Sequence, residues 1–286
     1  MPSEIIQTHR AQILFPKGGW DTHHHIFEPH AFPYSPTRHL TPPPATIEAF
    51  ENFRRRLGIT NSVLTHGLSY GDDCSSLKDF VGRLGKQSTS AVGVIDPEAT
   101  SDSEILDMHK SGIRGIRVNL YRYKAMEDTG FWNTLAPFVR REIVPSGRQL
   151  ITDHFALLKA PSMLPLEYRE DPTKQPGFAA IMGLVKDGHL FVKLSAPYRV
   201  SEQGPGYDDL EFLVRAFVAT NKHQILWGSD WPHTPRMKVR SHEEAMKETP
   251  FLEVDDEKWL QTLKSWLSDE EWDLIMVQNP RRLFAA

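Results

Sequence analysis

Residues 20–27, with the sequence WDTHHHIF, decide the fold. In a β-strand, side chains two positions apart face the same side, so His23 and His25 project together while His24 points away. Two imidazoles on one face can share a divalent metal ion or one substrate oxygen. The pair ends an apolar strand pattern and opens a long irregular loop at residues 28–44, a position that favours a functional role over a purely structural one.

Outward from this stretch, short apolar runs alternate with segments of helical periodicity, which is typical of an α/β protein with a parallel sheet. The predicted strands are residues 20–27, 62–68, 91–95, 113–120, 149–155, 190–195 and 224–229. Helical patterns occupy residues 46–57, 76–84, 101–111, 131–143, 177–186, 208–221, 256–267 and 268–278. Because no linker divides these elements, we predict one domain over residues 1–286.

Composition excludes several classes of function. The chain has 286 residues, with 33 basic and 37 acidic side chains and a net charge of −4, and no basic stripe suggests a nucleic-acid partner. No apolar stretch approaches the ~20 residues of a membrane span, and the amino terminus lacks a signal-peptide pattern. The single cysteine, Cys74, allows no intrachain disulfide. We therefore expect a cytoplasmic protein that acts on a small molecule, and its oligomeric state stays open.

Two further strand ends carry chemistry. Residues 227–233, WGSDWPH, end an apolar run on the carboxylate of Asp230, just before a proline breaks the pattern. Asp230 would lie at the carboxyl end of its strand, which is the catalytic rim of a barrel. In residues 152–155, TDHF, His154 takes the same position and could polarise a carbonyl or bind a metal ion. The structural alternatives are an aspartate that caps the next turn and a hydrogen-bonded core histidine.

These motifs, in this order, resemble the amidohydrolase superfamily, in particular its amidohydrolase-2 group and the 2-pyrone-4,6-dicarboxylate lactonase-like hydrolases. Residues 32–36 (FPYSP), 115–119 (GIRVN) and 279–283 (NPRRL) extend the similarity over nearly the whole chain. The resemblance implies a distorted TIM-type β/α barrel with its site at the carboxyl ends of the strands.

The resemblance also implies roles for the site residues. Asp230 would act as the general base on the attacking water, while His23, His25 and His154, or a metal ion they hold, would polarise the carbonyl. Arginine binds a carboxylate through two parallel N–H groups, and substrate clamping is implied for two arginines by their position. The predicted substrate-binding residues are Arg117 and Arg199, with Arg122, Tyr123, Tyr34 and His39 as weaker candidates.

Whether a metal ion takes part stays open. His23, His25 and Asp230 could hold one zinc ion, with His154 as a further ligand. The lactonase-like subgroup, by contrast, implies catalysis without metal.

The sequence also departs from the family. Eight strands are expected but only seven are recognisable, because residues 120–148 lack the pattern of a fifth βα unit. Residues 121–125 could serve as an irregular replacement for the missing strand.

Three functions fit this sequence. The first is hydrolysis of a lactone or a related cyclic carboxylated molecule. The second is a metal-dependent, non-oxidative decarboxylation on the same scaffold. The third is an inactive or shortened barrel homologue, which the missing βα unit would explain.

Overall fold

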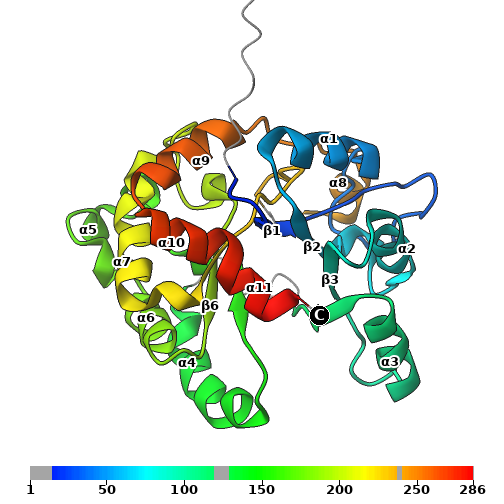
Figure 1. Cartoon of the computed structure of the whole chain (residues 1–286), viewed down its shortest axis with the longest axis horizontal. Coiled ribbons are helices and arrows are strands. Elements are labelled where there is room, and N and C mark those ends of the chain that lie inside the picture. The colour runs from blue at the N-terminus through cyan, green and yellow to red at the C-terminus, as the bar shows by residue number, and fades with distance from the viewer. Residues whose placement is uncertain (1–14, 119–128, 237–239, 286) are drawn as a thin grey trace, which may run out of the picture.

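Seven parallel strands alternate with helices in a computed structural model that describes residues 15–118, 129–236 and 240–285 (Figure 1). One sheet has the order β1-β2-β3-β4 and the other has the order β5-β6-β7. The strands are β1 (Trp20–His24), β2 (Asn61–Thr65), β3 (Thr89–Gly93), β4 (Ile113–Ile116), β5 (Ile151–Thr152), β6 (Phe191–Leu194) and β7 (Ile225–Trp227). All seven predicted strands are therefore present, and the α/β class with parallel sheets is confirmed.

The helices follow the predicted segments, and polar caps explain where several begin. The Thr46 side chain accepts a hydrogen bond from Ala49, and Gly58, with φ of 83°, ends the first helix. No helix in the described ranges is long and apolar enough to cross a membrane. The helices are α1 (Ile47–Leu57), α2 (Ser75–Leu84), α3 (Asp102–Lys110), α4 (Phe131–Phe138), α5 (Leu166–Arg169), α6 (Phe178–Lys186), α7 (Glu211–Asn221), α8 (His242–Met246), α9 (Asp256–Ser265), α10 (Asp269–Asp273) and α11 (Asn279–Phe284).

The two sheets meet where β1 lies against the chain that follows β7. The backbone N–H of Asp230 donates to the carbonyl of His23 at 2.8 Å, and that of His25 donates to the carbonyl of Trp231 at 2.8 Å. This close approach requires Gly228, because a Cβ there would lie 2.6 Å from the Cβ of His23 and 2.8 Å from its backbone nitrogen. The contact holds the histidine pair of β1 beside Asp230.

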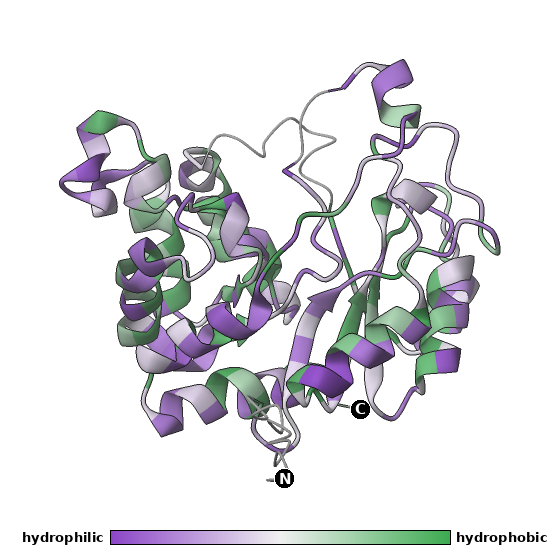
Figure 2. Cartoon of the chain, turned by 90° about the horizontal axis from the view of Figure 1, so that it is seen from above, coloured by the Kyte–Doolittle hydropathy of each residue, from purple (hydrophilic) through white to green (hydrophobic). Residues whose placement is uncertain are grey.

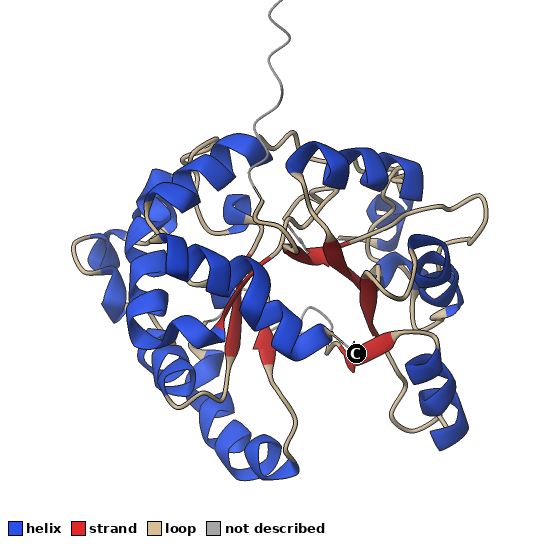
Figure 3. Cartoon of the chain, viewed as in Figure 1, coloured by secondary structure: helices blue, strands red, loops and turns tan. Residues whose placement is uncertain are grey.

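On the opposite side, β4 and β5 have no strand partner on their outer edges among the described residues. Ile116, the last residue of β4, is 46% exposed, which is unusual for an apolar residue in a parallel sheet, and Val118 just beyond the strand is 70% exposed. The irregular strand predicted at residues 121–125 lies outside the described residues. Figure 3 shows the strands arranged around a common centre, with most of the helices outside them and α11 crossing in front of that centre.

A small apolar cluster between the strands contacts both sheets. Its members are Trp20, Val63, Phe191, Leu226 and Phe284. Phe284 belongs to α11, and its carbonyl accepts a hydrogen bond from Ser90 at 3.0 Å. In Figure 2 the helices carry hydrophobic and hydrophilic stretches side by side, as amphipathic helices that cover a sheet do. Because this cluster fills the space between the strands at their amino-terminal ends, the carboxyl ends of the strands are the place for a site.

Candidate active site

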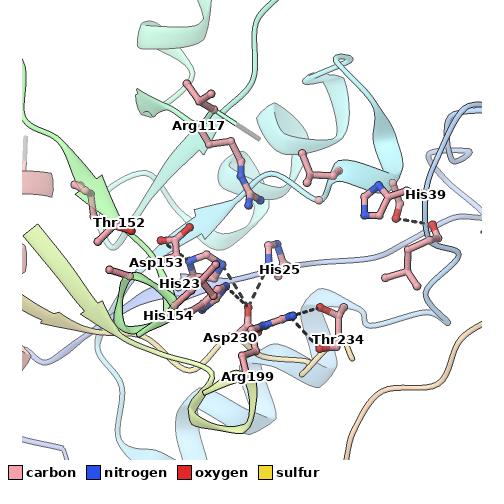
Figure 4. Close-up of a pocket in the computed structure, with 18 of the residues that line it drawn as sticks. His23, His25, His39, Arg117, Thr152, Asp153, His154, Arg199, Asp230 and Thr234 are labelled. Atoms are coloured by element: carbon pink, nitrogen blue, oxygen red, sulfur yellow. Dashed lines mark hydrogen bonds and ion pairs between the residues drawn. The ribbon is translucent and has the colours of Figure 1, made fainter. Parts of the chain in front are cut away.

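The predicted catalytic residues converge in one pocket at the carboxyl ends of the strands (Figure 4). His23 and His25 come from β1 and its extension, His154 follows β5, and Asp230 follows β7. All four are buried. The expectation that separate parts of the chain deliver these side chains to one cavity agrees with the structure, whereas their chemical roles remain predictions.

Three imidazoles surround one oxygen of Asp230. Its Oδ1 lies 3.4 Å from Nε2 of His23, 3.6 Å from Nε2 of His25 and 4.0 Å from Nε2 of His154. Neither Asp230 Oδ1 nor His23 Nε2 has a hydrogen-bond partner, although both atoms are buried. Buried polar atoms without partners are rare, so this group of atoms requires an explanation.

The contact that each histidine makes through Nδ1 bears on whether Nε2, which faces Asp230, carries a proton or a lone pair. His25 Nδ1 lies 2.8 Å from the carbonyl oxygen of Thr65, and a carbonyl can only accept, so Nδ1 carries the proton. In the neutral ring, His25 Nε2 therefore presents a lone pair to Asp230, which is itself an acceptor. His154 Nδ1 contacts the Ser195 hydroxyl at 2.9 Å. A lone pair that faces a carboxylate oxygen, as at His25, fits a bound cation, because it can then serve as a ligand.

Burial keeps the imidazoles of His23 and His154 neutral. It lowers the pKa of His23 to about 4, although Asp153 and Asp230 act in the opposite direction. It also lowers the pKa of His154 to about 3. At neutral pH both rings therefore have a free lone pair, which is the form that binds a metal ion.

The other oxygen of Asp230 is fully engaged. Oδ2 accepts hydrogen bonds from the Tyr198 hydroxyl and from Nε and Nη2 of Arg199, the latter two at 3.2 and 3.1 Å. Burial acts to raise the pKa of Asp230, but the Arg199 guanidinium outweighs it and holds this pKa well below its usual range. Asp230 is therefore ionised, and Oδ1 is its available atom.

Arg199, predicted as a substrate clamp, is occupied by protein groups. Besides Asp230, it donates to the carbonyl and hydroxyl of Thr234 at 3.0 Å each and to the carbonyl of Pro235 at 3.3 Å. In this arrangement it orients Asp230.

Arg117 is placed differently. It donates to the carbonyl of His66 at 2.9 Å, and its Nε is buried without a partner. Its side chain points into the pocket (Figure 4), as expected for a residue that binds an anionic group.

The weaker candidates divide into three groups. His39 lines the pocket, and burial lowers its pKa to about 4. Tyr34 is not among the residues that line the pocket, because its hydroxyl donates to the Pro42 carbonyl at 3.1 Å and its ring packs against Tyr70. The structure therefore does not bring Tyr34 to the site. Arg122 and Tyr123 lie outside the described residues.

Sequence reasoning missed an ion pair next to His23, between the buried Lys193 and the half-buried Asp153. Lys193 Nζ lies 3.0 Å from Asp153 Oδ1 and 3.3 Å from His23 Nδ1, and Asp153 Oδ1 lies 3.1 Å from the same nitrogen. The sequence contained a signal for this pair, because Lys193 is the charged residue in the apolar strand FVKL. A lysine is almost never buried without a partner of opposite charge. Asp153 was seen only as the neighbour of His154.

Two site residues have a left-handed backbone. Asp230 has φ of 61° and His154 has φ of 55°, values that residues with a side chain rarely adopt. Such conformations cluster at functional sites, where the surrounding structure holds them in place. Here they turn each side chain into the pocket directly after its strand.

Comparison with known proteins agrees with this geometry. The sequence model described as "Amidohydrolase" matches residues 20–125 and 147–286. The chain is 30% identical to a 4-sulfomuconolactone hydrolase of Rhizobium radiobacter, over 99% of this chain and 96% of that protein. It is 26% identical to a 2-pyrone-4,6-dicarboxylate hydrolase of Comamonas testosteroni, over 80% of this chain and 81% of that protein.

A solved structure supports the fold. It is a probable 2-pyrone-4,6-dicarboxylic acid hydrolase of Acinetobacter baumannii with bound citric acid, and it superimposes with a TM-score of 0.71 at 20% identity, over 94% of this chain and all of that one. The chain belongs to the amidohydrolase family and is a hydrolase. The predicted resemblance to the lactonase-like members is confirmed.

Proposed function

We propose that this protein hydrolyses the ester bond of an anionic lactone. The observation that carries the proposal is the convergence of three imidazole nitrogens and Asp230 Oδ1 within 4.0 Å in a pocket that also contains Arg117. The named relatives, which act on a sulfonated and a dicarboxylated lactone, support the substrate class.

Asp230 is placed to act as the general base. Because Tyr198 and Arg199 occupy Oδ2, only Oδ1 can take a proton from a water molecule in the pocket. The water oxygen then bonds to the lactone carbonyl carbon, the ring C–O bond breaks, and the ring oxygen leaves with the proton that Asp230 took from the water. Buried, fixed groups stabilise the charge that develops on the carbonyl oxygen better than bulk water does.

We further propose that the site binds one divalent cation, with zinc as the first candidate. His23 Nε2, His25 Nε2 and Asp230 Oδ1 would hold it, with His154 Nε2 as a further ligand, and the ligand atoms of the first three lie within 4.8 Å of one another. When bound, such an ion polarises a carbonyl and lowers the pKa of water. The contact of His25 Nδ1 with the Thr65 carbonyl supports this choice, because it fixes the ring with Nε2 directed at Asp230 Oδ1.

Arg117 would bind the anionic substituent of the substrate. Around the pocket, three cationic side chains face two carboxylates, so an anionic ligand is favoured electrostatically. The cationic groups are Arg117, Lys193 and Arg199, and the carboxylates are Asp153 and Asp230. Lys193 and Arg199 are paired already, which leaves Arg117 for the substrate.

The test is hydrolysis of a panel of carboxylated and sulfonated lactones by the wild-type protein and by Asp230→Asn. We expect ring opening without release of carbon dioxide, and a loss of about 10²–10⁴-fold in kcat for the variant. Thermal unfolding of both proteins controls for folding. Carbon dioxide as the product would favour the decarboxylase alternative, and unchanged kcat in Asp230→Asn would refute the assigned base.

We also propose that the two sheets are parts of one TIM-type barrel that lacks a βα unit between β4 and β5. The apolar cluster shared by both sheets and the hydrogen bonds between β1 and the chain after β7 support this interpretation. The family match is interrupted over residues 126–146, in the region where the sequence lacks the pattern.

A further inference from the structure

Lys193 is a buried cation next to the candidate metal ligands. It is 3% exposed in the middle of β6, and its ammonium contacts both Asp153 Oδ1 and His23 Nδ1. A lysine is buried at this depth only when its charge is compensated. Asp153 supplies that compensation from the end of β5, on the side of His23 that faces away from Asp230.

The same atoms belong to a second group that could hold a metal ion. His23, Asp153 and His154 offer ligand atoms within 4.8 Å of one another, and this group shares His23 with the group that contains Asp230. A divalent ion in the second group would need the Asp153 carboxylate, whose Oδ1 already lies 3.0 Å from the ammonium of Lys193. Ammonium and metal ion therefore compete for one carboxylate.

The charges favour the ammonium. Asp153 and Asp230 each have one cationic partner, Lys193 and Arg199, at 3.0 and 3.1 Å. An ion at His23 Nε2, His25 and Asp230 Oδ1 still meets three free ligand atoms. Arg199 contacts only Oδ2 of Asp230 and leaves Oδ1 for this ion. A second ion would instead meet Asp153 Oδ1, which the ammonium already contacts, and the two positive charges would repel each other.

We propose that the ammonium of Lys193 takes the place of a second divalent cation at Asp153 and His23. This inference rests on the cation site of the proposed function. The site therefore accepts one ion rather than two. Lys193 is a positioning residue, because it fixes Asp153, and Asp153 in turn orients the ring of His23 through Nδ1.

Counting bound ions tests this inference without measuring turnover. The protein is stripped with a chelator and titrated with Zn²⁺ in a calorimeter, and the ions that remain after gel filtration are counted by mass spectrometry. We expect one ion in the wild type and two in Lys193→Met, which removes the charge and keeps the length of the side chain. The double variant Lys193→Met/Asp153→Asn should return to one, because it lacks the carboxylate of the second group.

Lys193→Gln provides a second neutral variant that keeps an N–H for Asp153, and it should also bind two ions; thermal unfolding controls for the fold of each variant. Two ions in the wild type, one ion in both neutral variants, or two ions in the double variant would each overturn the inference. Failure of all forms to bind Zn²⁺ would overturn it together with the cation site. Absence of lactone hydrolysis with these ion counts intact would instead overturn only the proposed reaction.

Discussion

At the level of single residues, the two oxygens of Asp230 have different surroundings. Oδ2 is saturated by Tyr198 and Arg199, while Oδ1 faces three histidine nitrogens and has no hydrogen-bond partner. This asymmetry orients the carboxylate and leaves one atom for a proton or a cation. Arg117 shows a similar asymmetry, since one of its nitrogens donates to the His66 carbonyl while its Nε is buried without a partner.

Replacing Arg117 with methionine tests its contact with substrate. Loss of a hydrogen bond to a charged group costs about 1.5–3 kcal/mol. We therefore expect KM for a carboxylated or sulfonated lactone to rise by roughly ten- to a hundred-fold, with a smaller change in kcat. An uncharged lactone of the same ring size is the control, and an equal rise in KM for it would contradict the assignment.

Asp21 makes the stability of the protein depend on pH. Burial raises its pKa from the ordinary 3.8 of an aspartate to about 7, although hydrogen bonds from Ser229 and His23 lower it. Between these two values the folded state keeps a proton that the unfolded chain releases, so stability falls as pH rises. The contribution is complete below about pH 4 and has been lost by about pH 7.

The variant Asp21→Asn keeps an acceptor for both backbone N–H groups and cannot titrate. We expect the metal-free wild type to lose stability relative to this variant between pH 4 and pH 7, as measured by urea unfolding at several pH values. A difference between the two proteins that stays constant over this range would show that Asp21 is ionised throughout.

At the level of elements, the turns after the strands place the site. β5 has only two residues, although the apolar run predicted a strand over residues 149–155, because His154–Leu157 forms a turn with positive φ at each position. The predicted helices at 131–143 and 268–278 also change, each ending in a π-helical turn. Periodicity predicted these elements but not their ends, since the ends depend on contacts with the rest of the protein.

Substitution of Gly228 tests the contact between β1 and the chain that follows β7. In Gly228→Ala the new methyl group would meet the backbone of His23, and we expect a loss of about 1–3 kcal/mol in unfolding free energy. Gly82→Ala in α2 is the matched control, because a Cβ there meets nothing within 4 Å, and alanine favours a helix by about 0.5–1 kcal/mol. Equal effects at both positions would contradict the proposed contact.

At the level of the whole molecule, the site joins parts of the chain that are distant in sequence. His23 and His25 belong to the first strand and Asp230 to the end of the last, so a cation held by all three would link the beginning and the end of the sheet arrangement. Binding to the folded state alone stabilises it by mass action, by about 2.7 kcal/mol at a hundred-fold excess over Kd.

We therefore expect Zn²⁺ to raise the unfolding temperature of the wild type and a chelator to reverse the shift, as followed by calorimetry. Asp230→Asn should show a clearly smaller shift, because the carboxylate ligand is lost. A shift of the same size in the variant would place the cation elsewhere on the protein.

The sequence by itself determined the alternation of strands and helices, the shared face of His23 and His25, and the position of Asp230 at a strand end. These features depend on local periodicity and on neighbours a few residues apart. Only the tertiary structure decided that Arg199 holds Asp230, that Lys193 and Asp153 meet at His23, and that Tyr34 stays outside the pocket. Such contacts join residues far apart in the chain, and their distances follow from how the sheets pack.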